Sequence, residues 1–102
     1  MVKFLNLLGL ATKAGKTCSG EFAVEQSIKQ RSARLVIIAA DASDNTKKHF
    51  NDMCTYRDIP ILEISDREGL GKCTGKQERV SVSVLDQGFA EKLLSIIREV
   101  II

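Results

Sequence analysis

The stretch Arg34-Leu35-Val36-Ile37-Ile38-Ala39-Ala40 decides the fold of this chain. It is a continuous apolar run rich in β-branched residues, which is the pattern of a strand covered by helices on both faces. We therefore predict that residues 35–40 form the central strand of the domain. The periodic segments on either side of this strand then set the fold class.

Upstream of this strand the sequence predicts two helices. The first covers residues 2–13 and can end at Gly15. A brief strand over residues 16–18 precedes the second helix, which Ser19 can cap and which runs to about Gln30. The first helix is indicated by apolar residues at helical spacing, namely Phe4, Leu5, Leu8 and Ala11.

Downstream, helices and strands continue to alternate. Asp41 or Ser43 can cap a helix that reaches about Tyr56, and a strand over residues 61–64 leads to a short helix over residues 66–73. The inward residues of the helix before Tyr56 are Phe50, Met53 and Cys54.

The last two elements complete the pattern. The segment Val80-Ser81-Val82-Ser83-Val84 alternates as a half-covered strand does, and a final helix begins at Asp86. This helix carries one apolar stripe, formed by Phe89, Leu93, Ile96 and Val100. The alternation of helix and strand predicts an α/β fold, a three-layer α/β/α sandwich.

Length and composition favour one domain in a reducing compartment. The 102 residues are 44% apolar and 27% charged, and the formal net charge of +2 does not by itself indicate a nucleic-acid partner. The cysteines are odd in number and lack a C-x-x-C pair, so neither a disulfide framework nor a zinc site is expected, and no cofactor is implied. No segment has the roughly 20 apolar residues that span a bilayer, and we expect a cytoplasmic protein without a membrane partner.

The second predicted helix holds the most informative surface pattern. Phe22, Gln26 and Lys29 recur at i, i+4 and i+7, opposite the inward face of Val24 and Ile28. A ring, an amide and an ammonium in line suit unstacked nucleotides, and the helix start at Gly20 offers free N–H groups to an anion. The alternative is that Phe22 packs against the first helix while Gln26 and Lys29 are ordinary solvated surface.

Positive charge gathers around the same helix. Between Lys13 and Arg34 the sequence has five basic residues and only two acidic ones, Glu21 and Glu25. The basic residues are Lys13, Lys16, Lys29, Arg31 and Arg34. The polar loop over residues 76–79 could reach a ligand held by the second helix, or it could be an exposed connector. The glycines of residues 69–75 have the wrong spacing for a phosphate-binding loop.

Enzyme chemistry has little support in the sequence. His49 is the single histidine, and Cys54 lies at an inward helical position without a second histidine to activate it. We therefore predict that the chain is not an enzyme.

Several motifs together resemble a known family. Ser19-Gly20, Arg34 to Ala39, Ile59-Pro60 and Leu70-Gly71-Lys72-Cys73 look like the archaeal and eukaryotic kink-turn-binding ribosomal proteins. Two further segments resemble its short bacterial branch, the YlxQ-type proteins: residues 9–16 (GLATKAGK) and residues 86–90 (DQGFA). The resemblance covers nearly the whole chain. It implies a single kink-turn-binding-type domain over residues 1–102, a mixed four-stranded sheet, and binding of kink-turns, sharply bent RNA internal loops with tandem G·A pairs.

The resemblance also implies where RNA would be contacted: the start of the second helix, the turn after the central strand and the loop before the last strand. The chain departs from the archaeal pattern, because Phe22, Ala23 and Gln26 stand where that pattern has Asn, Glu and Lys. Glu21 can replace the lost acceptor, and Gln26 can still donate to guanine. With the basic residues nearby, the predicted RNA-binding set is Lys13, Lys16, Gly20, Glu21, Phe22, Gln26, Lys29, Asp41, Ala42, Glu78, Arg79, Val80 and Ser81.

The principal hypothesis is a monomeric, ribosome- or translation-associated protein that binds structured RNA, ribosomal RNA being one candidate. The rival hypothesis is a protein-interaction module of the same fold, with weak or lost RNA binding, that offers Phe22 as an exposed anchor to a ribosomal or transcription protein.

Overall fold

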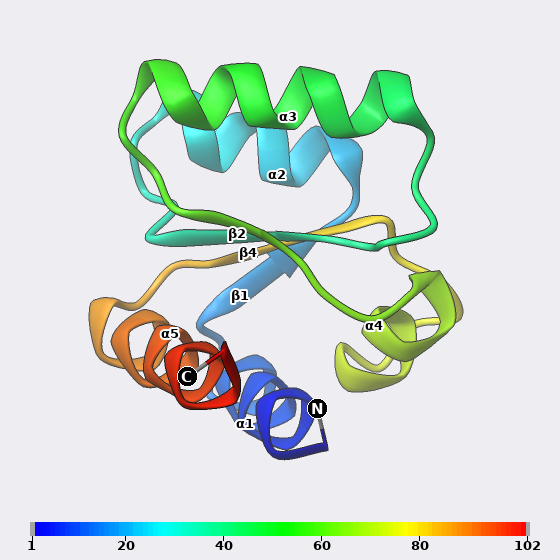
Figure 1. The fold of residues 1–102 in the computed structure, drawn as a ribbon, viewed down its shortest axis with the longest axis vertical. Coiled ribbons are helices and arrows are strands. Elements are labelled where there is room, and N and C mark those ends of the chain that lie inside the picture. Colours follow the sequence, from blue (N-terminus) through cyan, green and yellow to red (C-terminus); the bar gives the residue numbers. More distant parts are fainter. Residues whose placement is uncertain (1, 102) are drawn as a thin grey trace.

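The chain folds into three layers, with a sheet between two groups of helices (Figure 1). The structure is a computed structural model that describes residues 2–101 and the side chains of residues 2–99. Helices α2 and α3 cover one face of the sheet, and α1, α4 and α5 cover the other (Figure 1). The predicted α/β/α sandwich is therefore confirmed. The helices are α1 (Val2–Lys13), α2 (Glu21–Lys29), α3 (Asp44–Tyr56), α4 (Arg67–Cys73) and α5 (Gln87–Ile101), and the strands are β1 (Thr17–Ser19), β2 (Leu35–Ile38), β3 (Ile61–Glu63) and β4 (Ser81–Val84).

The sheet is mixed and has four strands in the order β1-β4-β2-β3, as the family resemblance implied. Strand β2 runs parallel to β3 and antiparallel to β4, and β4 runs antiparallel to β1. Val82 lies opposite Ile37 on one side and Ser19 on the other. Strand β2 is thus an interior strand, as predicted, and it shares the interior of the sheet with β4.

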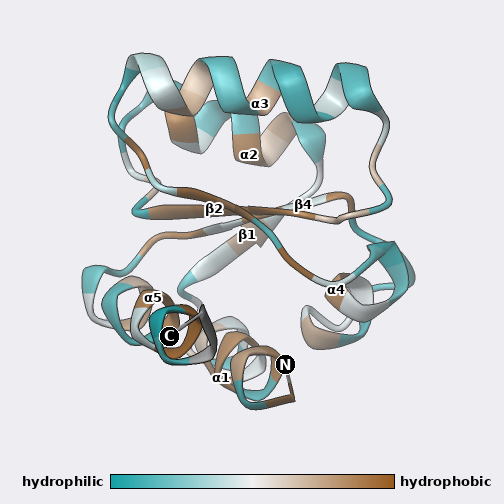
Figure 2. Ribbon diagram, in the orientation of Figure 1, coloured by the Kyte–Doolittle hydropathy of each residue, from teal (hydrophilic) through white to brown (hydrophobic). Residues whose placement is uncertain are grey.

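Strand β2 supplies apolar side chains to two separate cores because successive residues of a strand point to opposite faces. Leu35, Ile37 and Ala39 pack against α1 and α5, whereas Val36 and Ile38 pack against α2 and α3. All five of these side chains are fully buried. Figure 2 shows the result, with hydrophobic strands between helices whose outer surfaces are mostly hydrophilic.

Strand β4 differs from the half-covered strand that its alternating sequence predicts. Val82 and Val84 point into the core beneath α1 and α5, but Ser81 and Ser83 are fully buried as well, on the opposite face. The Oγ atoms of Ser83 and Ser27 lie 2.7 Å apart, so a hydroxyl pair replaces solvent on that face. The prediction was wrong because a buried serine gives the same alternating pattern as an exposed one. Ser83 has a hydroxyl partner on that face, whereas Ser81 Oγ has no hydrogen-bond partner among the described residues.

The structure corrects one predicted helix cap and decides between two candidates for another. Ser19 does not cap α2, because it belongs to β1 and the N-cap is Gly20, at φ 94° and ψ 149°. Of the two candidates for α3, Ser43 is the cap, and its Oγ accepts from the N–H of Thr46 at 3.2 Å. The stripe on α5 is buried at Leu93 and Ile96, while the side chain of Val100 lies outside the described residues. No helix within residues 2–101 is both long enough and apolar enough to cross a membrane.

Candidate nucleic-acid interface

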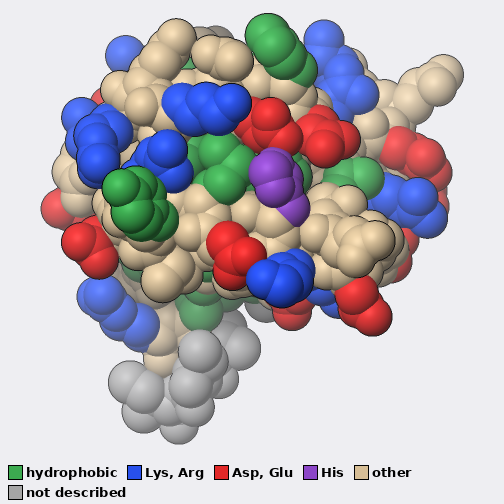
Figure 3. Space-filling view, turned by 90° about the horizontal axis from the view of Figure 1, so that it is seen from above, with side chains coloured by type: hydrophobic (Ala, Val, Ile, Leu, Met, Phe, Trp, Pro, Cys, Tyr) green, Lys and Arg blue, Asp and Glu red, His purple; other side chains and the backbone are tan. Residues whose placement is uncertain are grey.

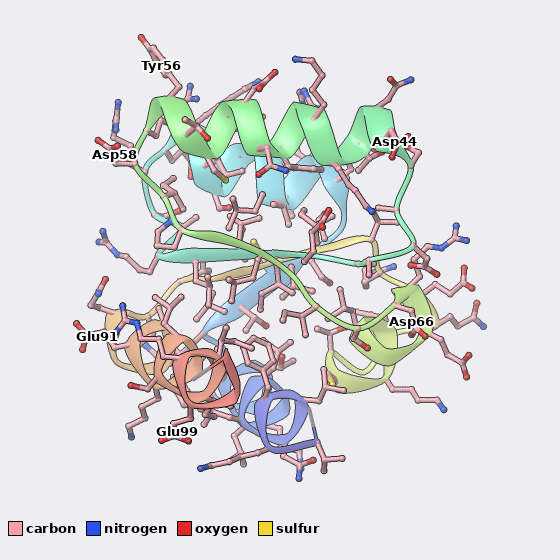
Figure 4. The ribbon with its side chains drawn as sticks, viewed as in Figure 1. Asp44, Tyr56, Asp58, Asp66, Glu91 and Glu99 are labelled. Atoms are coloured by element: carbon pink, nitrogen blue, oxygen red, sulfur yellow. The ribbon has the colours of Figure 1, made fainter. Side chains whose placement is uncertain are left out.

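Three segments that are distant in sequence meet at one end of the sheet. Because β4 runs antiparallel to both β1 and β2, its first residues lie beside the last residues of those two strands. The N–H of Gly20 donates to the carbonyl of Ser81 at 3.1 Å, and the N–H of Ala39 donates to the carbonyl of Val80 at 2.9 Å. The start of α2, the turn after β2 and the loop before β4 therefore form one continuous surface. It lies at the end of the molecule where Figure 4 labels Asp44 and Asp66.

The start of α2 is open in a way that suits close contact with a ligand. A φ of 94° at Gly20 belongs to the region that side chains with a Cβ rarely adopt, and nothing lies within 4 Å of the position that a Cβ would take there. No side chain caps this helix end. The first N–H groups of the helix, which have no acceptor within it, are therefore available to an anion.

The outward side chains of α2 agree in part with the predicted stripe. Phe22 is 76% exposed, so the alternative that it packs against the first helix is wrong. Glu21 is also exposed, whereas Gln26 is half-buried. Val24 and Ile28 are fully buried on the inward face, as predicted.

Arg79 holds the loop before β4 against the end of β1. Its Nε donates to Ser19 Oγ at 3.0 Å, its Nη1 donates to the carbonyl of Glu78 at 2.9 Å, and its N–H donates to the carbonyl of Arg67 at 3.0 Å. The half-buried Arg79 therefore positions this surface, and the exposed Glu78 projects beside it. Sequence reasoning did not find the role of Ser19, because its partner Arg79 lies 60 residues away.

The turn after β2 is held by α4. The carboxylate of Asp41 accepts from the N–H of Arg67 at 3.0 Å and lies 3.4 Å from its Nε. Ala42, half-buried, packs against the core beneath α2 and α3. Arg67 is thus a second residue of this region that sequence reasoning did not single out.

Three predicted basic residues lie away from this end. The carbonyl of Lys16 accepts from the N–H of Leu85, beyond the last residue of β4, and β1 separates Lys16 from Gly20 by about 13 Å at roughly 3.3 Å per residue. Lys13, at the end of α1, precedes it. Lys29 lies in the last turn of α2, about 12 Å along the helix from Glu21 at 1.5 Å per residue.

Catalysis by a metal or a thiolate would require the described residues to hold a cluster of metal ligands or a cysteine with a lowered pKa. No group of three or more His, Cys, Asp or Glu side chains in this part of the chain is placed to hold a metal ion. Cys54 is fully buried, as predicted, and burial raises the pKa of its thiol to about 11. Burial also raises the pKa of Cys73. His49 is on the surface, where its Nε2 lies 2.7 Å from Glu25 Oε1, a contact between α3 and α2 that the sequence did not reveal.

Together, the mixed sheet and the glycine-led helix start define a small α/β/α domain of ribosomal-protein type. More specifically, the chain belongs to the Ribosomal protein L7Ae/L30e/S12e/Gadd45 family, whose pattern it matches over residues 3–94. This confirms the resemblance that the motifs indicated.

Relatives of known name support the assignment. The chain is 44% identical over 96 residues to the RNA-binding protein YlxQ of Bacillus subtilis, covering 94% of this chain and 96% of the relative. It is 37% identical to the RNA-binding protein YlxQ of Enterococcus faecium, over 93% of this chain and 91% of the relative. It is 29% identical to the large ribosomal subunit protein eL8 of Thermoplasma volcanium, over 89% and 76% of the two chains. None of these names denotes an enzyme, in agreement with the prediction.

Solved structures show the same fold. A Bacillus halodurans protein, described only as having unknown function, superimposes with a TM-score of 0.92 at 39% identity, covering 96% of this chain and 99% of the other. A Giardia lamblia 15.5 kD RNA-binding protein gives a TM-score of 0.81 at 21% identity, over 96% and 87% of the two chains. This second likeness concerns the fold alone.

Proposed function

We propose that the chain is a single-domain RNA-binding protein of the cytoplasm that recognises a kink-turn or a similarly bent RNA at the end of the sheet around Gly20. The observation that carries the proposal is the uncapped start of α2 at Gly20, bonded to the start of β4 and open on its outer side. Relatives that match nearly the whole chain are named RNA-binding proteins or a ribosomal protein, which supports RNA as the ligand.

Each segment of this surface has a distinct role in the proposed RNA binding. The free N–H groups in the first turn of α2 donate to a phosphate, and the missing Cβ of Gly20 lets the RNA backbone approach closely. Phe22 offers its exposed ring to an unstacked base, and Glu21 or Gln26 contacts a base edge. Glu78 to Val80 and Asp41-Ala42 form the wall beside them, held by the bonds of Arg79 and Arg67. Ser81, predicted as part of this set, is fully buried and lies beneath the wall.

A shape-dependent RNA site predicts a difference between two RNAs of equal length and charge. An RNA with a kink-turn and a fully paired control would be compared by fluorescence anisotropy at fixed salt, because phosphate contacts make every affinity depend on salt. We expect at least tenfold tighter binding of the bent RNA. Equal affinity for the two RNAs would rule out recognition of the bend.

A pair of matched variants locates the site. Phe22→Ala removes an exposed ring, and stacking of one base is worth about 1–3 kcal/mol, so we expect the affinity to fall by about 5- to 150-fold. Leu10→Ala truncates a hydrophobic side chain that is 57% exposed on α1, away from this surface, and should leave binding unchanged. Loss of a co-purifying protein on Phe22→Ala, with RNA affinity intact, would favour the rival protein-interaction module instead.

A further inference from the structure

The end of the molecule opposite Gly20 carries a second cationic surface. Arg31, Arg34 and Arg57 line a hollow of about 390 Å³ between the ends of α2 and α3 and the start of α5. In the view onto α2 and α3, Lys and Arg side chains gather at the end of the molecule where α3 finishes (Figure 3). Tyr56 and Asp58 mark the same end in Figure 4. This surface is separate from the one around Gly20.

The hollow has an excess of positive charge that is not neutralised within the protein. Among the described side chains, none of the three guanidinium groups lies within 4.0 Å of a carboxylate oxygen. Asp58 is the only carboxylate among the residues that line the hollow. Arg31 and Arg57 follow helix ends and so offset their negative dipoles, but Arg34, directly before β2, has no such explanation. The surface therefore suits a ligand with more than one negative charge.

The guanidinium of one arginine, Arg57, is held in place by contacts, and Arg31 has an unusual backbone conformation. Arg57 Nη1 donates to the carbonyl of Met53 at 3.2 Å, and its guanidinium lies over the ring of Tyr56, with Cζ 5.3 Å from the ring centre. Arg31 has a φ of 59°, a conformation in which glycine is the usual residue after a helix. The chain thus keeps a cation where glycine would fit with less strain. A guanidinium held in advance loses less conformational freedom when it binds a phosphate.

Helix α2 joins the two ends of the molecule. It begins at the Gly20 surface and ends beside Arg31, about 16 Å away at 1.5 Å per residue, with the exposed Lys29 between them. An RNA bent at Gly20 has helical arms on both sides of the bend. At roughly 2.8 Å per base pair of an A-form RNA helix, an arm that follows α2 reaches Arg31 after about six pairs.

We propose that Arg31, Arg34 and Arg57 bind the phosphates of one helical arm of the RNA whose bend is held at Gly20. This inference rests on the proposed function, because it needs an RNA seated at the other end of α2. Arginine suits the task since its planar group binds phosphate oxygens through two parallel N–H bonds.

The test is the salt dependence of RNA binding. Each phosphate contact contributes about 0.9 to the slope of log affinity against log salt, so the triple variant Arg31→Gln, Arg34→Gln, Arg57→Gln should lower the slope by about 2–3. Three RNAs would be used, one with two arms of ten base pairs and two in which one arm or the other is cut to four. We expect the triple variant to lower the slope for the RNA with two long arms. We expect the slope to be unaffected by this variant when the arm that lies along α2 is cut to four base pairs.

Controls separate this contact from general charge effects. The variant Lys3→Gln, Lys48→Gln, Lys92→Gln removes the same charge from other surfaces and should change the slope less, and equally for all three RNAs. Arg31→Gly, which relieves backbone strain, keeps the fold and should lower the slope by about 0.9 through the loss of one contact. An unchanged slope for the arginine variant on the long RNA, or the same fall on all three RNAs, would overturn the inference.

The two proposals fail in different ways. Equal binding of bent and straight RNA by the unaltered chain removes the proposed function, whatever the arginines do. Preferential binding of the bent RNA with no effect of arm length removes only the second surface.

Discussion

Replacing Gly71 by alanine tests how the loop before β4 is positioned. Gly71 is buried in α4, and a Cβ there would contact the carbonyl oxygen of Gln77, lie 2.6 Å from its carbonyl carbon and lie 2.8 Å from Glu78 Cα. All three atoms belong to the backbone, so no side-chain rotation can relieve the overlap. Forcing an extra carbon into such a place costs about 1–3 kcal/mol or more. Alanine recovers about 1 kcal/mol of helix propensity, and because all three contacts are with backbone we take the upper end of the cost, so we expect a net loss of about 2 kcal/mol.

A second glycine in a helix provides the matched control. Gly9 lies within α1, where a Cβ would meet the carbonyl oxygen of Cys73 at 3.6 Å, an ordinary van der Waals contact. Gly9→Ala should therefore be neutral or stabilising by up to about 1 kcal/mol. Urea unfolding of both variants, compared by midpoint at equal slope, measures the difference. The reasoning is refuted should Gly71→Ala prove as stable as Gly9→Ala.

The same substitution reaches the proposed RNA surface. Relief of the overlap requires residues 77–78 to move away from α4, and this segment leads directly into Glu78 to Ser81. We expect Gly71→Ala to weaken RNA binding under conditions where it is fully folded, whereas Gly9→Ala should not. Unchanged RNA affinity in a folded Gly71→Ala protein would show that this loop is not part of the binding surface.

Three further predictions concern stability. Ser27 Oγ lies 2.6 Å from the carbonyl of Val24 and 2.7 Å from Ser83 Oγ, so Ser27→Ala leaves the buried Ser83 hydroxyl alone at a cost of about 1–3 kcal/mol. Ser83→Ala should cost less, and a double-mutant cycle that gave no coupling would contradict the pairing. The pKa of Cys54 is raised to about 11 from 9.0, which means that the unfolded chain loses this proton first and stability falls as pH rises from 9 to 11. Denaturant unfolding should show that the free energy of unfolding is about 2 kcal/mol lower at pH 11 than at pH 8, and that Cys54→Ala lacks this loss. An equal loss in both proteins would reject the link between Cys54 and the pH dependence. Asp66 Oδ1 accepts from the N–H of Gly69 at 2.7 Å and so caps α4. Asp66→Ala should lower the unfolding free energy by about 1 kcal/mol, whereas Asp66→Asn, which keeps a capping oxygen, should lower it less. Thermal melting of the two variants would measure the difference.

The parts of the fold that local pattern determines could be predicted from the sequence. The run from Leu35 to Ala40 indicated a strand covered on both faces, and it is the strand that feeds both cores. The serines of β4 misled the prediction because their burial depends on α2, and Ser27 lies 56 residues from Ser83. No local rule distinguishes such a paired hydroxyl from a solvated one.

The candidate site shows the same division. The start of α2 was recognised from Gly20 and Phe22, whose neighbours in sequence are also their neighbours in space. Arg79 was expected to contact RNA, but it also bonds to Ser19 and so fixes the loop, a contact that depends on the antiparallel pairing of β1 and β4. Lys16 was grouped with Gly20 through the family resemblance and as a nearby basic residue, yet the residues between them form β1 and place the two at opposite ends of the sheet.

The outermost strands of the sheet, β1 and β3, are each only three residues long. An exposed edge strand can pair with a strand of another copy and so start a fibril. A short edge strand offers few unpaired amides and carbonyls for such pairing. Helices lie over both broad faces, so flat stacking of one copy on another is blocked too. We expect concentrated solutions of this protein to stay clear and monodisperse, which leaves each copy free for its nucleic acid.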